Sequence, residues 1–239
     1  KTRLVEKTKR ILDELHIIKN RSRYDFTPDL AGRPQNLELF SFPQTGKDIC
    51  RLPAYQSADI VHFHWITWFV DYECFFAQNR KPLVWTLHDF NPFTGGCHYP
   101  LGCRSYEAQC NDCPQLKGTR NSTISRKVQM VKAAAIQARH CTIKVISPSQ
   151  WLAECAERSA VMHGLPTTVI RNSLNADSFT KRDKAFSREL FGISQDAYVI
   201  LFVAQVVKNG RKGFALLRDA LKSLKTDREI ELCAVGRAG

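Results

Sequence analysis

The chain has 239 residues, of which 44% are hydrophobic and 24% are charged, and its formal net charge at pH 7 is +12. This composition is typical of a soluble globular protein. No apolar run approaches the roughly 18 residues of a membrane span, and the basic start carries no secretory signal. We therefore expect a cytoplasmic protein whose partners are acidic: nucleic acid, nucleotide phosphates or anionic lipid.

Short apolar runs alternate with helical patterns along the first two thirds of the chain. An amphipathic helix is predicted at 3–19, and 20–57 are predicted to form loops with short strands. After that, strands are predicted at 58–64, 82–88, 142–147 and 167–170, with helices at 123–140 and 150–163. Continuous apolar strands separated by helices indicate an α/β domain with a parallel sheet covered on both faces.

A second unit begins after a polar stretch. We interpret 172–188 as a linker, which divides the chain into domains at 1–171 and 172–239. In the second part, the sequence pattern predicts a strand at 198–204, a helix at 214–225 and a strand at 230–235. One β-α-β unit cannot cover both faces of its sheet, so this domain is expected to be incomplete.

Nine cysteines without a secretory signal favour metal ligands or free thiols over disulfides. Four of them, Cys97, Cys103, Cys110 and Cys113, follow the spacing C-x5-C-x6-C-x2-C. Four thiolates suit tetrahedral Zn²⁺, and a C-x2-C half presents two sulfurs from one tight turn. Three interpretations stay open: a structural zinc site, reduced thiols packed in a loop, and disulfides. In a zinc site, His98 or His88 could replace one cysteine.

Three histidines lie where predicted strands end. His88 follows the second strand, and ligands of open α/β sheets bind at the carboxyl ends of strands. It is a candidate for proton transfer or substrate binding, or a histidine bonded within its loop. His62 and His64 end the first strand, followed by Trp65 and Trp68. They predict either a substrate-lining loop or aromatic packing at the sheet edge.

A basic loop, Arg211-Lys212-Gly213, lies between a predicted strand and a helix. The start of a helix with two cations beside it suits a diphosphate. A basic loop that is only solvated would have the same sequence pattern. The sequence lacks a G-x-x-x-x-G-K-[ST] phosphate loop, a G-x-G-x-x-G turn after the first strand and a G-x-S-x-G elbow. These absences disfavour ATPases, dinucleotide enzymes and α/β-hydrolases.

Taken in order, five segments resemble the retaining glycosyltransferases of the GT-B fold. Within these, the resemblance is to family 4, in a bacterial branch for polysaccharide synthesis whose members have a Cys-rich loop. The five segments are ADIVHFHWI, KPLVWTLHDFNPFTGGCHYPLGCRSYEAQCNDCPQL, VISPSQWL, VIRNSLNADSF and ILFVAQVVKNGRKGFALLRDAL. The resemblance covers about residues 55–239.

The resemblance implies an enzyme with a Rossmann-like N-terminal domain for a glycan or lipid-linked saccharide acceptor and a Rossmann-like C-terminal domain for a UDP- or GDP-sugar. It implies no metal or other cofactor in catalysis. His88 takes the role of contacting the transferred sugar or acceptor, and Asp89 joins the substrate site. Lys212, helped by Arg211, contacts the donor diphosphate, and Asn172 lies near the cleft.

The sequence departs from the family pattern in three ways. Gln205 stands near the place where many members have an arginine, and the glycine-rich loop after the first N-terminal strand is missing. The family's E-x7-E element is expected beyond Gly239; Glu6 and Glu14 match its spacing by chance. The chain alone is therefore expected to be inactive.

A second hypothesis is a zinc-containing basic protein that binds nucleic acid. Against it, residues 97–113 contain only Arg104 as a cation, beside Glu107 and Asp112, whereas a phosphate-binding zinc knuckle should be cationic. We therefore expect no nucleic-acid partner. The positive charge also fits peripheral contact with an anionic inner membrane, where lipid-linked acceptors reside.

Overall fold

The computed structural model describes residues 30–34, 37–117, 119 and 123–238, so the predicted helix at 3–19 and the pair Glu6 and Glu14 lie outside the described residues. The chain divides into two compact units between Ser173 and Leu174. Each unit is an α/β unit with parallel strands, as the sequence predicts. The GT-B arrangement of the two units and their roles stay predictions.

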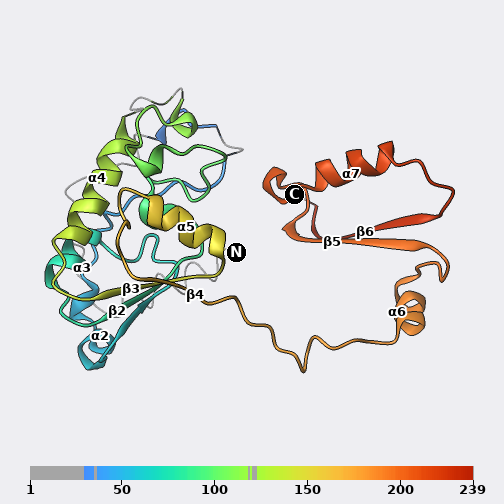
Figure 1. Ribbon diagram of the computed structural model, residues 1–239, viewed down its shortest axis with the longest axis horizontal. Coiled ribbons are helices and arrows are strands. Elements are labelled where there is room, and N and C mark those ends of the chain that lie inside the picture. The colour runs from blue at the N-terminus through green and yellow to red at the C-terminus, as the bar shows by residue number, and fades with distance from the viewer. Residues whose placement is uncertain (1–29, 35–36, 118, 120–122, 239) are drawn as a thin grey trace. The chain divides into compact units, whose positions relative to one another are not determined.

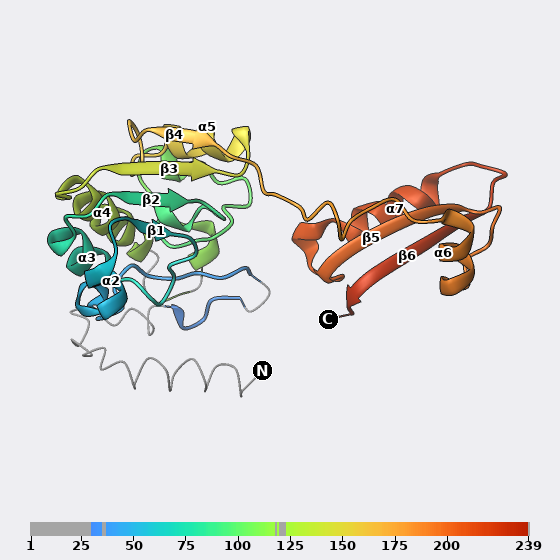
Figure 2. The ribbon, with the colours of Figure 1, turned by 90° about the horizontal axis from the view of Figure 1, so that it is seen from below.

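The first unit contains a four-stranded parallel sheet with the strand order β1-β2-β3-β4. Its strands follow one another in space as they do in the chain, and α3, α4 and α5 lie on one face of the sheet (Figures 1 and 2). Its strands and helices are β1 (Val61–Phe63), β2 (Leu83–Thr86), β3 (Ile143–Ser147) and β4 (Thr167–Val169), with α2 (Pro53–Ser57), α3 (Tyr72–Gln78), α4 (Ile124–Gln137) and α5 (Gln150–Arg158).

The core lies between that helical layer and one face of the sheet. Leu83 and Trp85 are fully buried, whereas Val84 and Thr86 on the opposite face are partly exposed and Lys144 is exposed. The predicted coverage of both faces is therefore wrong for the described part of the chain. Crossovers of one hand between strands in chain order bring successive helices to the same face, which accounts for the difference.

Local caps explain where the helices begin. The Ser149 hydroxyl accepts a hydrogen bond from the backbone N–H of Leu152 at 3.2 Å, so its predicted role as N-cap of α5 is confirmed. The Asp71 carboxylate accepts from the N–H of Cys74 at 3.1 Å and begins α3 in the same way. Short α2 falls within a segment predicted to contain no helix.

The second unit pairs β5 (Tyr198–Val206) with β6 (Ile230–Arg237) in parallel, connected through α7 (Phe214–Ser223) and preceded by α6 (Lys184–Phe191). Helix α6 begins inside 172–188, the segment interpreted as a linker, and the linker itself stays a prediction. The Asp183 carboxylate caps this helix by accepting from the N–H of Phe186 at 2.7 Å. Leu201 and Val203 of β5 are 63% and 66% exposed.

Candidate functional site

The carboxyl ends of β1 and β2 place two predicted site histidines side by side. These strands pair in parallel with Phe63 opposite Trp85, so the loops that follow them emerge at the same edge of the sheet. His64 Nδ1 and His88 Nε2 lie 3.0 Å apart, and both rings are exposed. Neighbouring strand ends thus present two imidazoles to solvent.

The third histidine continues this row of rings. His62 lies with its ring centroid 4.3 Å from that of His64, and its Nε2 is 2.8 Å from the hydroxyl of Thr86. Desolvation and then the neighbouring His64 lower the pKa of His62, which favours its neutral form. The sequence prediction that His62 and His64 share a face is confirmed.

Two exposed indoles flank the histidines. Trp65 and Trp68 are 47% and 56% exposed and meet edge to face with ring centroids 5.6 Å apart. Trp68 has a φ of 63°, a left-handed backbone conformation that costs energy in a bulky residue. The Lys47 ammonium donates to the Trp68 carbonyl at 2.9 Å and holds this turn. Aromatic packing alone does not describe these rings, because much of their surface faces solvent.

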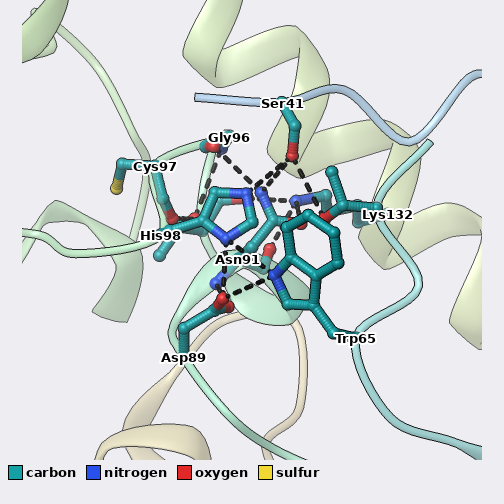
Figure 3. A network of polar contacts seen from close by, with 10 residues as sticks. Ser41, Trp65, Asp89, Asn91, Gly96, Cys97, His98 and Lys132 are labelled. Carbon is teal, nitrogen blue, oxygen red and sulfur yellow. Dashed lines mark hydrogen bonds and ion pairs between the residues drawn. The ribbon is translucent and has the colours of Figure 1, made fainter. Parts of the chain in front are cut away.

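Below this edge lies a buried polar network centred on Asp89 (Figure 3). One carboxylate oxygen accepts from the backbone N–H of Asn91 at 2.9 Å. The other lies 2.6 Å from His98 Nδ1 and 3.1 Å from Trp65 Nε1. That Asp89 binds substrate stays a prediction; its carboxylate is buried and engaged by three protein donors, which gives it a role in loop conformation.

The network fixes the tautomer of His98. Because a carboxylate only accepts, the proton lies on His98 Nδ1, and the Trp65 indole donates to Asp89. His98 Nε2 is 2.8 Å from the Ser41 hydroxyl, which accepts from the Asn91 amide at 3.0 Å. The Ser41 hydroxyl thus joins the His98 ring to the Asn91 amide.

Ser41, His98 and Asp89 have the connectivity of a nucleophilic triad, yet the environment argues against that chemistry. Ser41 and His98 are each only 2% exposed, so no substrate reaches the hydroxyl. A triad serine needs access to a scissile carbonyl and a set of oxyanion donors beside it. The arrangement is structural.

A buried lysine closes the network from α4. The ammonium of Lys132, fully buried, bonds the carbonyl of Asn91 and lies 3.2 Å from that of Thr94. Desolvation lowers its pKa to about 8. Sequence reasoning missed Lys132, although its i,i+4 spacing between Val128 and Ile136 placed it on the buried face of the helix.

The structure places the predicted donor residues in the second unit. Arg211 and Lys212 are exposed in a 3-10 turn (Gly210–Lys212) between the carboxyl end of β5 and α7. Gly213, with φ of 82°, is the N-cap of α7, and no side chain caps this end among the described residues. Asn172 is exposed in the segment that joins the two units.

The four predicted metal-binding cysteines gather around one small cavity beside the loop, together with Phe40 and Gly95. All nine cysteines are free thiols. Within the described residues, no three His, Cys, Asp or Glu side chains are arranged to coordinate a metal ion as they stand.

One comparison with known proteins gives a match. The chain is 32% identical over 129 residues to a protein of Escherichia coli (strain K12) provisionally named colanic acid biosynthesis glycosyl transferase WcaC. The match covers 50% of this chain and 32% of the relative, so the chain spans less than two thirds of that protein. No protein-family model and no solved structure matches the chain.

If Asp89 organises the loop, Asp89→Asn should lower the free energy of unfolding of the first unit by about 1.5–3 kcal/mol, because one charge-assisted hydrogen bond is lost and an amide N–H faces a donor. Chemical denaturation followed by circular dichroism measures this change, and tryptophan fluorescence should report a more mobile Trp65. Asp59→Asn, at an exposed carboxylate, serves as the control and should stay within about 0.5 kcal/mol. Equal effects of the two substitutions would contradict the role of Asp89.

Proposed function

We propose that the chain is part of a retaining glycosyltransferase that moves a sugar from a UDP- or GDP-sugar to a glycan or lipid-linked saccharide in polysaccharide biosynthesis. The observation that carries the proposal is the exposed His64–His88 pair, at the carboxyl edge of a parallel sheet and flanked by two exposed tryptophans. The similarity to a protein named as a glycosyl transferase supports the same class.

On the acceptor side, the side chains suit a saccharide. Imidazoles donate to and accept from sugar hydroxyls, and an indole offers a flat apolar face to the C–H groups of a pyranose. The hydrogen bond with His64 uses Nε2 of His88, which leaves Nδ1 to meet a substrate oxygen. We assign to His88 the contact with the transferred sugar or the acceptor.

On the donor side, Lys212 and Arg211 supply positive charge for a diphosphate. They precede α7, whose first-turn N–H groups add partial positive charge at the same end. Asn172 stays a weaker candidate for contact with substrate, because the described structure places it only in the connecting segment. Catalysis in this proposal uses no metal.

We place the enzyme in the cytoplasm, with peripheral contact to the inner membrane as the route to lipid-linked acceptors. No helix among the described residues combines the length and apolarity needed to cross a bilayer. The alternative of nucleic-acid binding is weakened further, because the Arg104 guanidinium near the cysteines is paired with Glu107 at 2.9 Å. That cation is engaged by a carboxylate instead of facing a phosphate.

For the donor site, Lys212→Ala should weaken binding of UDP or GDP by about 1.5–3 kcal/mol, the range for a hydrogen bond to a charged group. Calorimetric titration of the enzyme that contains this chain measures the affinity. Lys222→Ala, at an exposed lysine in the last turn of the same helix, is the matched control. Unchanged affinity in the Lys212 variant would remove this residue from the donor site.

For the acceptor edge, His88→Ala should lower turnover by roughly 10²-fold, the lower end of what a positioned acid–base group contributes. The affinity for UDP or GDP should change little, because the histidine belongs to the other unit. Steady-state assays with nucleotide sugars measure turnover, and His140→Ala, an exposed histidine preceding β3, is the control. A fully active His88 variant would refute its assignment.

A further inference from the structure

The cavity beneath the loop that follows β2 has the size and lining of a site for one ion. Cys97, Cys103, Cys110 and Cys113 all line it, and its volume is ≈ 20 Å³. A space of roughly 10–15 Å³ holds one water molecule, so this cavity has the size of a site for a single ion. The other five cysteines of the chain lie outside this cavity lining.

Glycine allows the loop to close around the cavity. A Cβ added at Gly95 would lie 2.8 Å from Cβ of Cys110 and 2.4 Å from the carbonyl oxygen of Ser125. The N–H of Gly95 also lies 3.2 Å from the Cys110 sulfur. Any larger residue at this position would push the cysteine away from α4, so the close approach depends on glycine.

The C-x2-C half ends in a turn that directs N–H groups at sulfur. Pro114–Leu116 form a 3-10 helix immediately after Cys113. Burial raises the pKa of the Cys113 thiol, and the backbone N–H groups of Gln115 and Leu116 offset part of this rise. Burial also raises the pKa of Cys97 to about 12 and that of Cys110 to about 11. The thiols therefore need the positive charge of a metal ion to lose their protons, and the N–H groups favour the resulting thiolate.

Two cations lie near the sulfurs. The Arg33 guanidinium would stabilise thiolates at Cys113 and Cys97, and the buried Lys132 ammonium would stabilise thiolates at Cys97 and Cys110. The Asp89 carboxylate already acts on the Lys132 ammonium and raises its pKa, although desolvation outweighs this effect. Zn²⁺ with four thiolates carries about two negative charges and would add to this counter-charge.

Neither candidate histidine can replace a cysteine without breaking another interaction. Both ring nitrogens of His98 are engaged, by Asp89 and Ser41, and His88 pairs with His64. The Cys97 sulfur points away from the His98 network (Figure 3). The donor set is therefore four thiols.

We propose that Cys97, Cys103, Cys110 and Cys113 bind one zinc ion that fixes the loop carrying Asp89 and His98. Loading requires the thiols to lose their protons and turn toward a common centre. Cys103 would leave its contact with the Ser105 hydroxyl at 3.4 Å. Four protein ligands leave no open position, so the ion is structural and takes no part in the transfer reaction.

The test is the metal content of the intact chain, purified without chelator and again after incubation with zinc. Inductively coupled plasma mass spectrometry should find one zinc per chain in the wild type. Cys110→Ser/Cys113→Ser should lose it, whereas Cys74→Ser, at a partly exposed cysteine outside the cavity, should keep it. Well under one zinc per chain after both preparations, or iron in its place, would overturn the proposal.

A second measurement on the wild type avoids variants that fail to fold. Thiol titration of the native protein, before and after metal removal with a chelator, should show four additional reactive cysteines once the ion is gone. Mass spectrometry under non-reducing conditions identifies disulfides among the four. An unchanged thiol count, or a disulfide between any of them, would contradict zinc binding.

Discussion

The buried carboxylate of Asp89 is the interaction on which the sheet edge depends. Asp89 is buried, and its carboxylate accepts hydrogen bonds from Asn91, His98 and Trp65. These three residues lie in the loops that follow β1 and β2. A buried charge is tolerated only when its partners satisfy it, so these loops have one favourable arrangement. The exposed face of Trp65 is oriented by the same bonds.

The network continues to parts of the chain that are distant in sequence. His98 reaches Ser41, and Lys132 from α4 bonds the carbonyls of Asn91 and Thr94. The loop after β2, helix α4 and the segment around Ser41 are thus held together by polar groups. Each of these groups would cost free energy if it were buried without its partners. The proposed glycosyl transfer uses this rigidity, because substrate-contacting groups at a sheet edge act best when their supports do not move.

The sequence indicated the parallel sheet and the position of His88, because apolar runs and strand ends have local signatures. It could not show that Ser41 meets His98, since pairing across 57 residues leaves no periodic trace. Helix α6 was missed because its first residues lie in the polar stretch 172–188 that was interpreted as a linker. The position of Asp89 at a strand end also did not reveal that its carboxylate is buried.

The protonation of the histidine rings tests the central claim most directly. A long-range ¹H–¹⁵N correlation spectrum of the chain distinguishes the two tautomers of each histidine. The account predicts that His98 Nδ1 carries a proton that is protected from solvent exchange, and that this protection is lost in Asp89→Asn. A His98 ring that exchanges freely with water, or that carries its proton on Nε2 alone, would contradict it.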